Sequence, residues 1–107
     1  MYKNIDKKKV LELEGLVKYR QGHVVSKTLV QNELISVTVF SLDKGEEIST
    51  HAAGEEVMVT VLEGKRKFTI EGDKYILEEG QTIIMPKDIP HAVYGEEKFK
   101  MILVVPF

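Results

Sequence analysis

Residues 57–94 read VMVTVLEGKRKFTIEGDKYILEEGQTIIMPKDIPHAVY, and this stretch decides the fold class. Short runs rich in β-branched and aromatic residues are separated by turn signals made of Gly, Asp and Pro. The runs are residues 57–62, 68–71, 74–77, 82–85 and 91–94. Short strands at a spacing of about 8–12 residues are typical of a sandwich or barrel. The stretch therefore predicts an all-β fold of antiparallel strands with little helix.

The sequence on both sides of this stretch extends the same pattern. Residues 34–42 and 99–105 predict two further strands, and residues 24–30 are expected to be extended. Residues 7–17 fit neither the helical nor the strand period well, so one helical turn and a strand at 10–13 both remain open. We expect one domain over residues 1–107, with its core at about 34–105 and an N-terminal strand segment at about 5–30.

Composition excludes several classes of function. The chain has 107 residues, 43% hydrophobic and 30% charged, with a net charge of −2, so neither a disordered chain nor a basic nucleic-acid-binding surface is expected. The absence of cysteine excludes disulfides, zinc–thiolate sites, iron–sulfur clusters and a cysteine nucleophile. No apolar run reaches the length of a signal peptide or a membrane span, so we expect a cytoplasmic protein with no membrane contact.

Two runs are apolar on both faces, residues 57–62 and 99–105. A sheet that is solvated on one side alternates apolar with polar residues instead, so something must cover the second face. Small domains bury a smaller fraction of their surface than large ones, which favours a homodimer whose partner covers one sheet face, with residues 10–13 lying across it. The alternative is that the N-terminal segment folds back on its own subunit.

Two histidines each follow a turn that begins with glycine. His51 lies just before a predicted strand, and His91 opens the predicted strand at 91–94. In a closed barrel two such positions can converge on one pocket, where imidazole serves as a metal ligand or as an acid or base. The third histidine, His23, is interpreted as a surface turn residue.

The spacing around these histidines resembles that of a known family. Gly45 is followed after five residues by His51, Gly64 is in register further on, and Gly80 is followed after five residues by Pro86 and then His91. With these motifs the chain resembles a small single-domain cupin. The resemblance implies a double-stranded β-helix, a jelly-roll-like barrel.

The chain departs from the family pattern at the metal ligands. Metal-binding cupins use three histidines and one glutamate, and the corresponding positions here hold His51, Ala53, Val57 and His91. Two of four ligand positions are therefore substituted. In the second motif, Asp88 replaces a glycine and Gly95 replaces an asparagine.

Glu55 and Glu56 are the candidate replacements for the missing ligands. Strand parity places Glu56 on the opposite face from His51, whereas Glu55 has the right parity but lies early, near the turn. A bulge at residues 53–54 would reset the phase. Either carboxylate would then complete a two-histidine, one-carboxylate set for a divalent metal such as Fe, Mn, Ni or Zn.

The favoured function is binding of a small molecule in a largely apolar pocket. The expected pocket residues are His51, Ala53, Val57, His91 and Met101; parity places Val57 there, and Met101 depends on the register of the last strand. The alternative is a metal-dependent enzyme of the dioxygenase or isomerase type that uses His51, His91 and an additional ligand. No cofactor is required by the first of these functions.

Overall fold

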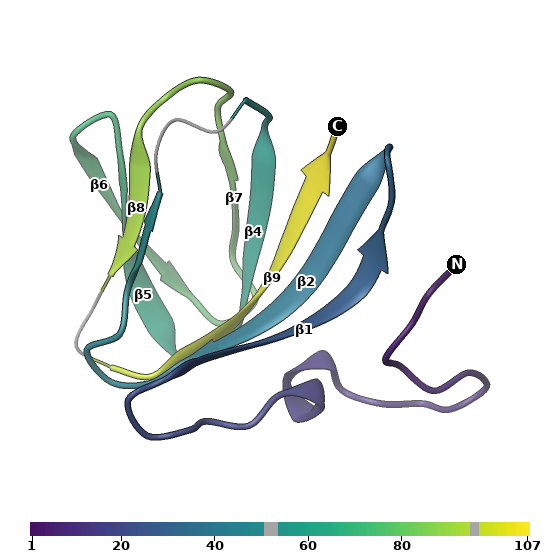
Figure 1. Ribbon diagram of the computed structural model, residues 1–107. Coiled ribbons are helices and arrows are strands. Elements are labelled where there is room, and N and C mark those ends of the chain that lie inside the picture. Colours follow the sequence, from purple (N-terminus) through teal and green to yellow (C-terminus); the bar gives the residue numbers. More distant parts are fainter. Residues whose placement is uncertain (51–53, 95–96) are drawn as a thin grey trace.

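The computed structural model describes residues 1–50, 54–94 and 97–107, and the described residues form two antiparallel sheets that curve into a barrel (Figure 1). The strands are β1 (Val24–Gln31), β2 (Ile35–Leu42), β3 (Ile48–Thr50), β4 (Val57–Glu63), β5 (Lys65–Ile70), β6 (Asp73–Glu78), β7 (Thr82–Met85), β8 (His91–Tyr94) and β9 (Phe99–Pro106). One sheet has the order β1-β2-β9-β4-β7 and the other β3-β8-β5-β6. The predicted all-β class and the barrel are confirmed.

The strand that the sequence did not predict is β3. It has three residues and, among the residues that the structure describes, pairs with β8 alone, with Ile48 opposite Val93. Three residues are too few for an alternating pattern to be read from the sequence. Tertiary pairing with β8 creates this strand.

The N-terminal segment differs from the expected strand segment at 5–30. Only β1 is a strand there; the chain before it is irregular except for a single 3₁₀ turn at Leu13–Leu16. The segment still reaches the edge of the sheet, because the Lys3 backbone N–H donates to the Leu29 carbonyl at 2.8 Å. Its apolar residues match neither period because they cover a surface and join no ladder.

This N-terminal segment covers part of the outer face of the five-stranded sheet (Figure 1). Val17 is buried there against Leu29 and Val39, with partly buried residues from the segment and from the sheet around them. The partly buried residues are Ile5, Leu13, Leu16, Val25, Ile35, Val37, Leu62 and Ile102. The second apolar face of β4 and β9 is thus covered, at Leu62 and Ile102, by the chain itself. A homodimer stays a prediction.

The core lies between the two sheets. On β4 the inward residues Val57, Val59 and Val61 are buried, in one cluster with Phe68 of the other sheet and Met101 of the neighbouring strand β9. This is the alternation expected of a strand with one face on the core. Within the described part of the chain, no helix has the length and apolar character needed to span a bilayer.

Candidate functional site

One end of the barrel is closed by a buried arginine. Arg66 faces inward from the start of β5 and is 2% exposed. Its guanidinium lies 4.5 Å from the centre of the Phe99 ring and donates to the Glu46 carbonyl at 2.9 Å and the Asp43 carbonyl at 3.4 Å. Burial lowers the pKa of Arg66, and the nearby charge of Glu47 counteracts this effect. The cation is therefore held by groups of its own chain.

A second polar cluster at this end fastens the N-terminal segment. The Lys100 ammonium is buried, donates to the Glu14 carbonyl at 2.8 Å and lies 3.9 Å from the Glu63 carboxylate. The Tyr19 hydroxyl donates to the same carboxylate at 2.6 Å, and Ser41 donates to the Lys18 carbonyl at 2.9 Å. These contacts join β2, β4 and β9 to the segment, so their role is structural.

The opposite end contains a cavity of about 360 Å³. Its walls come from both sheets and are mostly apolar side chains. The lining residues are Phe40, Ile48, Gly54, Glu55, Val57, Met85, His91, Val93, Met101, Leu103, Val105 and Phe107. A small-molecule site has this character, with apolar walls and a few polar groups that fix orientation.

His91 is the buried polar group among the described lining residues. It is 5% exposed and opens β8, directly after Pro90. Its Nδ1 lies 3.1 Å from the Ile89 carbonyl oxygen. Because a carbonyl can only accept, the proton must be on Nδ1, and the neutral ring then carries its lone pair on Nε2. The turn before β8 therefore fixes both the tautomer and the orientation of the ring.

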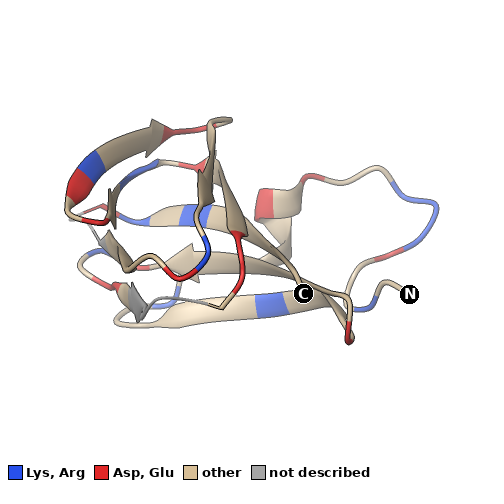
Figure 2. Ribbon diagram, turned by 90° about the horizontal axis from the view of Figure 1, so that it is seen from above, with Lys and Arg blue, Asp and Glu red and all other residues tan. Residues whose placement is uncertain are grey.

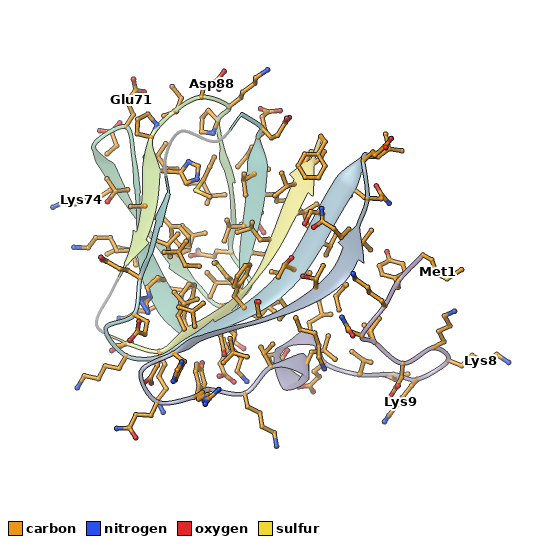
Figure 3. The ribbon with its side chains drawn as sticks, in the orientation of Figure 1. Met1, Lys8, Lys9, Glu71, Lys74 and Asp88 are labelled. Atoms are coloured by element: carbon orange, nitrogen blue, oxygen red, sulfur yellow. The ribbon has the colours of Figure 1, made fainter. Side chains whose placement is uncertain are left out.

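The turn before His91 accounts for one departure from the motif. Asp88 has a φ of 60°, in the left-handed region where glycine is favoured and Asp is tolerated. Figure 3 shows Asp88 and Glu71 at the same end of the barrel, with their side chains directed away from it. The Glu71 N–H donates to the Pro90 carbonyl at 2.9 Å, which ties the β5–β6 turn to the loop that carries His91.

At the end of the barrel opposite to the cavity, the backbone geometry requires a glycine at position 64. It has a φ of 79°, and a Cβ at this position would lie 2.8 Å from the Lys98 carbonyl oxygen. No side chain fits between the β4–β5 turn and the start of β9. This motif glycine therefore has a structural role. It follows the last residue of β4, whereas the first residue of β4, Val57, lines the cavity.

The structure places the predicted site residues as follows. Val57, His91 and Met101 line the cavity, while His51 and Ala53 lie outside the described residues. Glu55 lines the cavity and is half-buried; Glu56 is exposed and is not among the lining residues. His23 is exposed, and its N–H donates to the Arg20 carbonyl in a turn, as the sequence indicates. Gly95 is also outside the described residues.

The sequence reasoning missed most of the apolar wall. Leu103 and Val105 share the parity of Met101 on β9, and Phe40 lies opposite Met101 on β2. Parity along β9 could have found the first two. Phe40 required the pairing register, which a single sequence does not give.

The described residues do not form a complete metal site. No three His, Asp or Glu side chains among them come together in a way that could hold an ion. Around the cavity the described donor set is one imidazole, His91, and one carboxylate, Glu55. Catalytic metal sites usually have three protein ligands, so this set alone does not fit one.

Comparisons with known proteins agree with this architecture. The family model described as Cupin domain matches residues 38–106. A crystal structure of a conserved protein of unknown function from Streptococcus pyogenes is 48% identical, with a TM-score of 0.93 over 98% of this chain and 92% of that one. A cupin superfamily protein from Desulfitobacterium hafniense is 25% identical, with a TM-score of 0.95 over 100% and 98%. An uncharacterized protein of Aquifex aeolicus is 29% identical over 92% of this chain and 83% of its own length.

Proposed function

Because the chain belongs to the cupin domain family, we propose that it binds an uncharged small molecule in the cavity that His91 lines. The observation that carries the proposal is a cavity of about 360 Å³ with apolar walls and one buried imidazole. Apolar walls provide affinity by removing ligand surface from water, and a single fixed polar group provides orientation.

The volume of the cavity limits the size of the ligand. An apolar cavity of about 150 Å³ is enough to hold benzene. The cavity here is about 360 Å³, which suits a molecule of up to about two rings. Met85 and Met101 line it, and methionine adapts to irregular shapes, so the site favours a size class over one exact outline.

The charges around the cavity favour a neutral ligand. Its described lining residues include no Lys or Arg, and the charged one is Glu55, half-buried. An anion placed against these walls would lose its hydration with no cation to replace it, which is costly. The buried cations Arg66 and Lys100 are already engaged at the other end.

A matched pair of probes tests the proposal. We expect 2-naphthol to bind saturably and 2-naphthoate, which has the same rings but carries a negative charge, to bind at least about tenfold more weakly. Methyl-resolved NMR measures both the affinity and the place of binding, because Met101, Leu103 and Val105 should respond. Equal binding of the anion, or shifts confined to residues away from the cavity, would contradict the proposal.

A cavity-filling variant supplies the control. Leu103→Trp directs a larger side chain into the cavity and should abolish binding of 2-naphthol while the protein stays folded. The chain contains no other tryptophan, so the fluorescence of the new residue also reports whether its surroundings are apolar. Binding that survives this variant would place the site elsewhere.

One observation keeps a metal-dependent function as the alternative: Glu55 lines the same cavity as His91. With His51 these side chains would make a two-histidine, one-carboxylate set, which suits iron(II). Elemental analysis of the purified protein separates the two functions. Near-stoichiometric metal that is lost in the His51→Ala/His91→Ala variant would favour the alternative, and a metal content that both proteins share would exclude it.

A further inference from the structure

The outer edge of β6 is a sheet edge without a strand partner among the described residues. β6 is the last strand of its sheet, and β7, the last strand of the other sheet, is not paired with it. A groove of about 590 Å³ lies between them, lined by residues of β6 and β7 and by Gln81. Unpaired edges of this kind are templates for adding another strand.

The other three edges of the described sheets are shorter or partly covered. β3 has three residues and β7 has four. At β1 the N-terminal segment already bonds to the strand, through Lys3 to the Leu29 carbonyl and through the Asn4 side chain to the Thr28 carbonyl at 2.8 Å. β6 therefore offers an edge of six residues, on which the Glu78 N–H is already bonded to the Gln81 side chain.

The backbone groups that face outward on β6 follow from its hairpin. The β5–β6 turn has two residues, Glu71 and Gly72, both with positive φ, and it is closed by the pair Ile70 and Asp73. In such a hairpin the flanking pair is hydrogen-bonded, so alternate residues from Asp73 onward face β5. The residues whose N–H and C=O groups face the open edge are then Lys74, Ile76 and Glu78. In agreement, the Glu78 N–H donates to the Gln81 side chain at 2.8 Å and not to β5, so a strand that pairs along the whole edge replaces this side-chain bond with its own.

The side chains of the same three residues make this edge self-complementary. They alternate on the outer face of the sheet as positive, apolar and negative, and all are exposed, Ile76 by 66%. Figure 3 shows Lys74 directed away from the barrel, and Figure 2 shows the charges gathered at the two ends of this strand. In the described part of the chain neither Lys74 nor Glu78 has an ion-pair partner.

We propose that β6 pairs with β6 of a second copy of this chain, antiparallel and with Ile76 opposite Ile76 on a two-fold axis. This register places Lys74 of each copy opposite Glu78 of the other and joins the two four-stranded sheets into one. It also brings Tyr75, 42% exposed, next to Leu77 of the partner on the inner face. Opposite charges directly across an antiparallel pair are stabilising and like charges are destabilising.

The same arrangement explains why the edge closes as a dimer and does not continue. A parallel or shifted partner would place Lys74 opposite Ile76, or like charges together, whereas the two-fold register satisfies both charges at once. Isologous pairing consumes the edge of both copies, so no further copy can add. Because six residues a side bury less than a standard interface of about 1,600 Å², the dimer is expected to be weak and to depend on concentration in the micromolar range.

Charge reversal tests the register. Sedimentation velocity over the micromolar range should show a monomer–dimer equilibrium for the natural chain. Lys74→Glu or Glu78→Lys alone should raise the dissociation constant about tenfold, since two attractive pairs become repulsive. The double variant Lys74→Glu/Glu78→Lys should return it to within about threefold of the original. These side chains are exposed, so folding is not at risk; a monomer at every concentration, or a double variant as weak as the singles, overturns the proposal.

Cysteine cross-linking tests the place of contact, and the natural chain has no cysteine to interfere. Ile76→Cys should form an intermolecular disulfide under mild oxidation, because the two residues face each other across the axis. Ile84→Cys is the matched control: it is 51% exposed and lies on the outer face of the five-stranded sheet, outside the proposed contact. A dimer that cross-links through the second variant, or through neither, overturns the proposal.

Discussion

The two ends of the barrel differ in polarity: one is held by buried charged side chains, and the other has mostly apolar walls. At the closed end the buried guanidinium of Arg66 donates to the carbonyls of Glu46 and Asp43 and lies over the Phe99 ring, and Lys100 nearby binds the N-terminal segment and Glu63. The open end holds a cavity of about 360 Å³ whose walls are apolar apart from His91 and Glu55. The strands β2, β4 and β9 contribute residues to both ends.

The difference separates structure from function within one small domain. Buried charge is tolerated where the protein itself supplies polar partners, as the carbonyls of Asp43 and Glu46 do for Arg66. The apolar atoms that line a cavity lack packing contacts on one side, and a bound ligand would supply these contacts. A residue with unusual chemistry is thus a poor guide to the binding site here: Arg66 is the most deeply buried charged residue and lies at the end without the cavity.

The largest effect is expected at the closed end. Arg66→Met removes the cation from Phe99 and leaves the carbonyls of Asp43 and Glu46 without this donor, so the free energy of unfolding should fall by about 3 kcal/mol. Urea denaturation measures it. Lys65→Met, at the exposed neighbouring position on β5, should change stability by less than about 0.5 kcal/mol. An Arg66 variant as stable as the Lys65 variant would show that the closed end does not depend on its cation.

A second test compares equal substitutions on one strand. Val57 and Val61 both face inward from β4, but Val57 lines the cavity and Val61 is fully buried without lining it. Val61→Ile should cost about 1 kcal/mol by overpacking, whereas Val57→Ile should stay within about 0.5 kcal/mol because its extra methyl group enters the cavity. Thermal unfolding of both variants gives the comparison. Equal losses at the two positions would mean that the cavity has no room for a methyl group.

The smallest effect concerns alkaline pH. Burial raises the pKa of Tyr19, and its hydrogen bond to the Glu63 carboxylate and the charge of that carboxylate raise it further. Stability from the neutral hydroxyl is then fully present below the ordinary tyrosine pKa of about 10 and is lost as the pH rises above it. Tyr19→Phe should lose about 1 kcal/mol at neutral pH and show a shallower decline above pH of about 10. Identical alkaline slopes in urea titrations would contradict this account.

The strands were predictable where sequence signals were local. Residues 82–85 and 91–94 match β7 and β8 in both bounds, since turn residues flank each run. The N-terminal segment was not predictable in the same way. Leu13, Leu16 and Val17 follow no strand or helix period because the outer face of the sheet selects their positions, and that face exists only after the strands pair.

The residues of the candidate site also fall into those that local sequence signals predicted and those that depend on the tertiary structure. Strand parity and motif spacing led to Val57, His91 and Met101, which line the cavity. The parity argument about Glu55 could not reach an answer from the strand alone, because the residue precedes β4 and its position depends on how the loop enters the barrel. Phe40 could not be found from the sequence, because it meets the cavity only through the pairing of β2 and β9.

The sequence by itself determined every strand except β3, the turns and the β class, because each depends on the φ/ψ preferences and alternation of neighbouring residues. It also contained the charge order of β6, Lys74–Ile76–Glu78, without indicating that this edge would be open. Only the tertiary structure decided which end of the barrel is filled and which encloses a cavity. That outcome depends on which side chains from distant strands come to face one another, and pairing register and packing volume are properties of the whole chain.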